Sequence, residues 1–273
     1  MEPMRSIVAS VCLYAILLAP ASASAQFKAR PFSDPATGEV YHVELSGAIW
    51  NPNPEISVSS EALGIVGSKI DLVADLGVVK KSLRELRIVL RPATKHKFRI
   101  HYLPMRYAAD AIVTREFVFN GIRYRVGLPV STEFQWNAWR FAYEYDFLYR
   151  DRWFVGFVAA VDYTDVQVDL DSAIGAEFAR ARAPVPAFGG IVRGYVAPNI
   201  SITGELTGVK VPDSIKGDYR AHYIDFDLYG TVNFNDHVGA QVGYRSIDVD
   251  YQIKLDAGDF RQKGLYVSGV VRF

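Results

Sequence analysis

The sequence predicts an all-β protein, an antiparallel up-and-down transmembrane β-barrel of about ten strands, with eight and twelve as alternatives. Segments of about ten residues alternate apolar and polar side chains repeatedly along the chain, as the strands of such barrels do. The 16 Tyr, 16 Phe and 4 Trp residues exceed what a core of this size uses, and aromatic girdles at two membrane interfaces would account for them. The last alternating segment ends on Phe273.

The N-terminus has the pattern of a secretory signal peptide, so we expect residues 1–25 to be removed and residues 26–273 to form the barrel domain. A basic residue precedes an apolar run over 7–19, and Ala23 and Ala25 fit the small-residue cleavage rule. An uncleaved anchor is disfavoured because about 13 apolar residues fall short of the roughly 20 that a spanning helix needs.

The alternation predicts ten strands, and an even number places both ends of the barrel domain in the periplasm. They lie at about 39–51, 82–92, 95–119, 122–148, 152–169, 186–197, 199–210, 218–233, 237–253 and 259–273. The clearest segment carries aromatic side chains on one face, at Trp139, Phe141, Tyr143, Tyr145 and Phe147. Its other face is charged, and in a barrel the aromatic face contacts lipid while the charged face lines the lumen.

Turn signals divide the strands asymmetrically. Short turns rich in Asn, Asp or Pro are expected at 149–152, 197–199 and 233–236. Longer links alternate with them, at 170–185, 211–217 and 254–259. Short periplasmic turns and long extracellular loops are typical of membrane barrels.

Asn120-Gly121 is the strongest hairpin signal, because a type I′ turn needs two residues that tolerate positive φ. We interpret it as the tip of one tall hairpin that projects beyond the membrane on the extracellular side. The alternative is two hairpins broken near 108–110, which adds two strands. Residues 59–81 fit no strand pattern and are expected to form a long loop folded over or into the barrel mouth.

One strand changes phase in its alternation. From residue 237 onwards Val238, Val242 and Tyr244 share the apolar face, but Ile247 then falls on the opposite face. A β-bulge near Ser246 would return the later apolar residues to the lipid side.

The final ten residues, Gly264 to Phe273, alternate apolar side chains up to the terminal aromatic residue. With the signal peptide and the alternating strands, this segment resembles the outer-membrane β-barrel proteins of Gram-negative bacteria, in particular small OmpA-like and porin-like barrels. The resemblance covers the whole mature chain and implies a location in the cell outer membrane after export to the periplasm, but no activity. It also implies an assembly signal for the barrel-assembly machinery, carried by Leu265, Val267, Val271 and Phe273.

The predicted lumen face carries both signs of charge. Its candidate network residues are Arg99, Arg140, Glu144, Asp146, Arg193, Glu205, Asp225, Asp227 and Arg245, and His101 is expected to join them. Five further charged residues share this predicted face: Glu44, Glu85, Arg87, Arg91 and Lys97. A barrel of ten strands is scarcely wider than its side chains can fill. The charges therefore form either a salt-bridged plug or a narrow selective pore, and the mixed signs favour the plug.

An enzyme of the barrel rim, a protease or a lipid A modifying hydrolase, is the competing class of function. It would need a histidine beside a carboxylate or serine, and His222 precedes Asp225 and Asp227. His222 has lipid-face parity and both aspartates have lumen parity, so no catalytic residue is assigned and the chain is expected not to be an enzyme. Surface adhesion through the hairpin around Asn120 is the third class.

No cofactor or metal site is expected, because no His, Asp and Glu spacing is typical of a metal site and no glycine-rich phosphate loop follows a strand. The only cysteine, Cys12, lies in the signal peptide. A formal net charge of +0 without a basic run argues against nucleic acid. The expected partners are outer-membrane lipid and lipopolysaccharide, the barrel-assembly machinery and periplasmic chaperones, and the expected state is a monomer.

Overall fold

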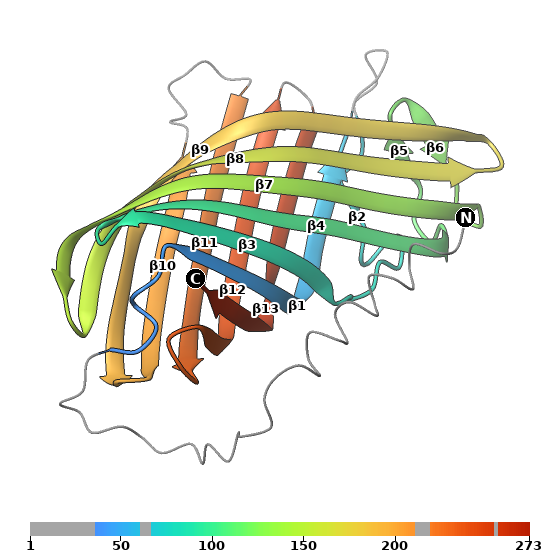
Figure 1. Ribbon diagram of the computed structural model, residues 1–273. Helices are drawn as coiled ribbons and strands as arrows, with labels where there is room; N and C mark the ends of the chain where they lie inside the picture. Colours follow the sequence, from blue (N-terminus) through green and yellow to red (C-terminus); the bar gives the residue numbers. More distant parts are fainter. Residues whose placement is uncertain (1–35, 61–66, 211–218, 254–255) are drawn as a thin grey trace, which may run out of the picture.

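A computed structural model describes residues 36–60, 67–210, 219–253 and 256–273. The predicted signal peptide lies outside the described residues. Within them the architecture is all-β (Figure 1). No helix in the described part of the chain is long and apolar enough to cross a membrane.

Ten antiparallel strands form a closed barrel, as the alternation predicts. They are β1 (Val43–Ser59), β3 (Leu83–Ala93), β4 (His96–Ile112), β7 (Pro129–Arg150), β8 (Trp153–Ser172), β9 (Gly175–Ala197), β10 (Ile200–Lys210), β11 (Tyr219–Asn233), β12 (Val238–Ile253) and β13 (Asp256–Arg272). Each pairs with the next in this order, and β13 pairs back onto β1 with Leu45 opposite Val271. The alternative predictions of eight or twelve strands are therefore wrong.

Three short strands lie outside this ring. β2 (Ile70–Asp71) pairs with β1 at Ser57 and Val58. β5 (Phe117–Phe119) and β6 (Ile122–Tyr124) form a separate hairpin. The predicted turn at Asn120 and Gly121 is confirmed, with φ of 47° and 83°. The break near 108–110 is wrong, because β4 pairs with β7 without a register shift from His96 to Ile112.

The short turns lie at one end of the barrel, and those predicted at 149–152, 197–199 and 233–236 are confirmed. The long link at 170–185 is wrong, because β8 and β9 pair continuously up to Ser172 and Gly175, where glycine adopts a φ of 146°. The link at 254–259 is also wrong, since β13 begins at Asp256. The link at 211–217 lies outside the described residues.

The kinds of side chain that point outward and inward change partway along the strands. The half of the barrel with the short turns is called the lower barrel, and the other half the upper barrel. On lower β8 the exposed outward residues are apolar, as at Phe157 and Val161, and Asp162 is buried inside. Above Tyr163, Asp165 takes the outward position while Val168 and Leu170 are buried. The lower barrel is therefore built for lipid outside and charge inside, whereas the upper barrel has the apolar core and polar surface of a soluble protein.

An outward row of aromatic side chains marks the boundary between the two halves. Tyr102 on β4, Trp139 on β7 and Tyr163 on β8 are in register on adjacent strands. The Tyr102 and Trp139 rings stack with centroids 4.3 Å apart. Such rows form where a barrel passes from hydrocarbon to headgroups.

The same change corrects the bulge predicted near Ser246. β12 pairs with β11 and β13 without any register shift from Val238 to Ile253. Ile247 is instead buried inside at 3% exposure. The alternation therefore keeps its phase. At this level of the barrel the apolar side chains change from the outward face to the inward face.

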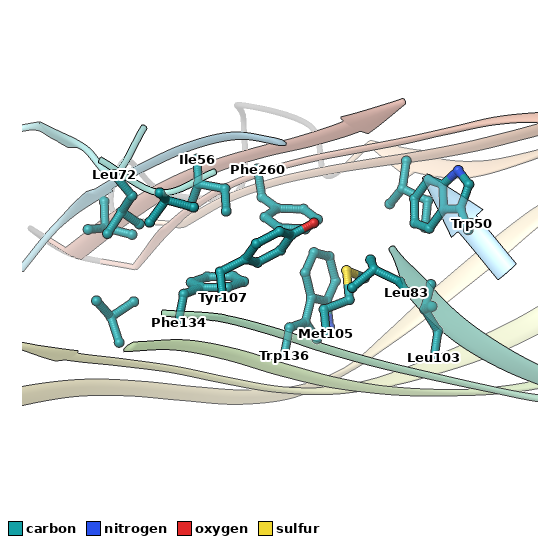
Figure 2. Close-up of a cluster of buried hydrophobic side chains, with 14 of the residues drawn as sticks. Trp50, Ile56, Leu72, Leu83, Leu103, Met105, Tyr107, Phe134, Trp136 and Phe260 are labelled. Atoms are coloured by element: carbon teal, nitrogen blue, oxygen red, sulfur yellow. The ribbon is translucent and has the colours of Figure 1, made fainter. Parts of the chain in front are cut away.

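The upper barrel encloses an apolar core to which opposite walls contribute (Figure 2). Phe260 of β13 meets Trp136 of β7 edge to face, with ring centroids 4.0 Å apart, and stacks on Phe134 at 5.5 Å. Tyr107 of β4 donates a hydrogen bond to Gln262 of β13 across the interior, at 3.1 Å. These contacts tie the two walls together.

Residues 67–82 fold over the barrel mouth, in agreement with the expectation for 59–81 as far as the chain is described. Leu72 and Leu76 are fully buried there. The backbone N–H of Ser68 donates to Val118 O at 2.8 Å, so the β5–β6 hairpin packs beside this segment. Asn120 at the hairpin tip donates to Glu177 of β9 at 2.5 Å. The single tall hairpin predicted with strands at 95–119 and 122–148 is therefore wrong, because β4 ends at Ile112, β7 begins at Pro129 and the turn at Asn120 belongs to the separate β5–β6 sheet.

Candidate functional site in the barrel interior

The lower interior of the barrel is filled with charged side chains. All nine candidate network residues point inward: Arg99, Arg140, Glu144, Asp146, Arg193, Glu205, Asp225, Asp227 and Arg245. Eight of them are buried below a tenth of their surface, and the side chain of Arg99 is 11% exposed. Period-two alternation on paired strands brings them together, because every second residue of each strand faces the axis.

Ion pairs connect most of these residues across five strands. Lys97 and Arg99 of β4 share Glu144 of β7, at 2.5 and 2.6 Å. Arg99 also binds Glu205 of β10 at 2.6 Å, and Arg140 of β7 lies 3.5 Å from the same carboxylate. Cations and anions thus alternate across the lumen.

A second group of contacts continues the chain toward β3 and β12. Arg245 of β12 binds Asp225 at 2.7 Å and Glu85 at 2.9 Å. Glu85 also lies 3.1 Å from His101 Nε2. His101 is thus placed among the network residues, as the sequence indicates. Arg87 then contacts both Glu85, at 3.4 Å, and Asp227, at 3.3 Å.

The network is close to charge-balanced. Including the lower end of the barrel, its cations are Arg87, Arg91, Lys97, Arg99, Arg140, Arg193, Arg245 and Arg272, and its carboxylates are Glu39, Glu44, Glu85, Glu144, Asp146, Asp162, Glu205, Asp225 and Asp227. Near-balance lets each buried charge find an opposite partner, without which its burial would be strongly unfavourable.

The segment before β1 enters the periplasmic end. Glu39 is buried and accepts hydrogen bonds from Arg193 at 2.9 Å and Tyr195 at 2.6 Å. Thr37 O accepts a hydrogen bond from Asn233 Nδ2 at 2.6 Å. Gly38 has a φ of +83°, and a Cβ there would approach Arg272 Nη1 to 2.7 Å. Only glycine fits this narrow passage between the segment and the wall.

Three residues of the interior were not singled out in the sequence. Asp162, 3.2 Å from Arg140, and Arg272, 2.6 Å from Glu44, both have lumen parity on their strands. Parity could therefore have identified these two. Glu39 precedes the first strand, and no periodic signal marks it.

The space left between these side chains is small. Three cavities of about 20 Å³ each lie among them, lined by residues that include Arg87, Arg140 and Lys97. A volume of this size holds about one water molecule. Charged side chains and the segment at 37–41 therefore occupy the cross-section of the lower barrel.

The remaining predicted positions lie on the outside. Leu265, Val267, Val271 and Phe273, named in the predicted assembly signal, are exposed on the apolar belt. His222 shares outward parity with Ile224, whereas Asp225 and Asp227 point inward, as their spacing indicates.

Charged residues also pair on the outer surface above the aromatic row. Arg180 and Arg182 of β9 both contact Asp165 of β8, at 2.6 and 3.1 Å. The hydrogen bond from Arg180 lowers the pKa of this partly exposed carboxyl to about 2. In the described residues no group of three or more His, Cys, Asp or Glu side chains is placed to hold a metal ion.

No protein-family model matches the chain, and no curated protein matches it. Among solved structures, the outer membrane protease OmpT from Escherichia coli superposes with a TM-score of 0.59 at 9% identity, over 85% of this chain and 97% of that one. An outer membrane channel from Pseudomonas putida F1 gives a TM-score of 0.40 at 11% identity, over 90% and 100%. Ail, the attachment invasion locus protein of Yersinia pestis, gives 0.38 at 8%, over 83% and 99%.

These likenesses concern the fold alone. The closed barrel of ten strands, its outward apolar belt and the aromatic row confirm the predicted transmembrane β-barrel and its location in an outer membrane, where such barrels occur.

Proposed function

We propose that this chain is a non-conducting, non-enzymatic outer-membrane barrel, a structural anchor that holds the capped upper β-barrel above the membrane. The observation that carries the proposal is the charge network across the lumen, where cations and carboxylates pair at 2.5 to 3.5 Å. An ion could cross only by separating these buried ion pairs. Their opposite charges attract each other strongly because little water is present to screen them. The narrow-pore alternative needs a continuous water path, which cavities of about 20 Å³ do not supply.

Conductance across planar bilayers tests this proposal. We expect reconstituted protein to give no discrete current steps at any voltage up to about 150 mV, because opening would break buried ion pairs that cost several kcal/mol each. Heat-modifiable migration of the same sample on gels shows that the barrel is folded and inserted. Regular unitary steps from folded protein would contradict the proposal and favour the narrow channel.

Two observations support a role without catalysis. His101, which lies 3.1 Å from Glu85 in the charge network, is inside the barrel at 6% exposure. His222 and the nearby Asp225 and Asp227 point to opposite faces of β11. An activity on peptides or lipid A that is lost in His222→Ala would argue for the rim hydrolase instead.

The proposed partners are lipid and lipopolysaccharide at the belt, and the barrel-assembly machinery with periplasmic chaperones during export. Arg180 and Arg182 support contact with lipopolysaccharide phosphates, since both are exposed just above the aromatic row. The alternating apolar residues that end at Phe273 support recognition during assembly. Closure of β13 onto β1 supports a monomer, because the ring closes on itself without a strand from a second chain.

A further inference from the structure

The upper barrel contains one cavity much larger than the spaces in the charge network. Its volume is about 260 Å³, and its walls come from β1, β7, β8, β9, β11, β12 and β13. Ile56, Phe134, Trp136 and Phe260 supply apolar surface to it, and they belong to the core shown in Figure 2. A cavity with such walls favours an apolar occupant, because water there would find few hydrogen-bond partners.

The cavity owes its space to small residues on β9. Between Ala179 and Ala187 this strand directs Ala181, Ala183 and Val185 inward, and all three line the cavity. β7 and β13 carry the large rings of Phe134 and Phe260. Alanine on β9 and aromatic rings on these two strands leave a slot into which a flat or chain-like molecule fits.

The floor of the cavity is polar and closed. Tyr223 lines the cavity, and its hydroxyl lies within 3.5 Å of Asp225 and of Arg140 in the charge network. An occupant can therefore not continue down the lumen.

The wall beside the cavity is incomplete in the described residues. β9 pairs with β10 only as far as Phe188 opposite Gly208, so residues 175–187 of β9 have a recorded ladder partner on the β8 side alone. Pro184 and Pro186 lie in this stretch, and proline is tolerated in a sheet where its nitrogen faces an open edge. Among the described residues, this stretch of β9 is therefore an edge of the sheet beside the cavity.

The position of the cavity relative to the membrane favours a free molecule over the acyl chain of a lipid as its occupant. The cavity lies above the row that contains Tyr163, and Arg182 at its margin is half exposed and paired with Asp165. An acyl chain would have to leave the hydrocarbon layer and pass this charged surface, which is unfavourable.

One residue of the cavity wall, Trp136, has a buried polar atom without a partner in the described part of the chain. The Nε1 donor of Trp136 is buried and has no hydrogen-bond partner among the described residues. A buried donor without a partner costs free energy that a ligand oxygen would recover.

We propose that this cavity binds a free, largely apolar molecule of about ten to twelve heavy atoms that carries a single hydrogen-bond acceptor. The size follows from scale, since an apolar cavity of about 150 Å³ engineered in another protein accommodates benzene, and this one is about 260 Å³. The aromatic walls of Trp136 and Phe260 suit a bicyclic aromatic molecule, because offset and edge-to-face ring contacts add to the burial of apolar area.

The test uses 6-bromo-2-naphthol as the probe and protein in nanodiscs, with bromine quenching of tryptophan fluorescence as the readout. We expect one saturable binding component above the linear signal of membrane partition, and this component should disappear in Trp136→Phe. Trp139 and Trp153 face outward and report the partition alone, and Trp50 is buried beside Arg245 in the charge network. In crystals soaked with the probe, the anomalous bromine signal should lie beside Phe134 and Phe260.

Substitutions on β9 provide a matched comparison. Ala181→Phe with Ala183→Phe fills the cavity and should weaken the saturable component at least tenfold. Ala176→Phe places the same side chain on the outward, exposed face of the same strand and should leave binding unchanged. The related probe 2-bromonaphthalene lacks the oxygen and should bind about two- to tenfold more weakly.

Quenching that does not saturate, or that is equal in all these folded variants, would overturn the proposal. So would a bromine signal elsewhere. A phospholipid that co-purifies in stoichiometric amount and is displaced by the probe would overturn the assignment to a free molecule in favour of a lipid chain. None of these outcomes depends on whether the barrel conducts.

Discussion

Arg245→Ala is expected to lower the free energy of unfolding by about 3 to 5 kcal/mol, since removing one partner of a buried ion pair leaves the others uncompensated. The guanidinium of Arg245 donates to both oxygens of Asp225, at 3.0 and 2.7 Å, and to Glu85 at 2.9 Å. The variant would retain two buried carboxylates with fewer cations near them. Equilibrium unfolding in urea, followed by tryptophan fluorescence and by the heat-modifiable band, measures the loss.

An exposed ion pair provides the control for this prediction. Arg123 and Glu116 pair at 2.8 Å with side chains 64% and 49% exposed, so Arg123→Ala should cost less than about 1 kcal/mol. Equal losses for Arg245→Ala and Arg123→Ala would mean that the lumen is hydrated and that its ion pairs are screened. That result would also weaken the proposal of a sealed barrel.

Phe260→Ala is expected to cost about 3 to 5 kcal/mol, the range for removing a large aromatic side chain from a packed core. Phe260 is 5% exposed and contacts Trp136 and Phe134 from the opposite wall. Its loss would leave a void that the hydrogen-bonded walls cannot close. Unfolding in urea is again the measurement.

Phe178→Ala is the matched control, because Phe178 lies on the outward face of the upper β9 and is 60% exposed. A change below about 0.5 kcal/mol is expected there. If Phe260→Ala proves equally mild, the upper barrel is not a packed core, and the cavity described beside Phe260 is not preformed.

The alternation along the chain was sufficient to predict the ten strands and their closure. It was also sufficient to place the charged residues, since Arg140 and Glu144 have lumen parity by counting alone. Where Ile247 follows Arg245 on the same face, parity could not say which face is apolar. That depends on whether lipid or water lies outside, and the sequence of a single strand carries no record of its height.

Residues 175–185 belong to β9 but lie within the link predicted at 170–185. Its inward residues from Ala179 to Ala183 are alanines, and its outward ones include Arg180 and Arg182. Small side chains suffice there because the cavity, and not a neighbouring ring, lies beside them.

The fold of residues 67–82 over the barrel mouth could not be predicted in detail, because the contacts of this segment join parts of the chain that are far apart in sequence. Val58 pairs with Ile70 across a link whose residues 61–66 are outside the described part of the chain, and Ser68 meets Val118 fifty residues later. Such pairings follow from the closed shape of the barrel, which no local pattern encodes.

The reversal of the two faces along each strand also sets how deeply the barrel sits in its membrane. If the barrel sank by two residues along β8, Asp165 and its partner Arg182 would enter hydrocarbon. If it rose by the same amount, Tyr163 and Trp139 would leave the interface that their rings favour. Charged side chains on the lipid face become more unfavourable with depth, so both displacements are opposed. The strands themselves act as a ruler that fixes the immersion depth, without help from any loop.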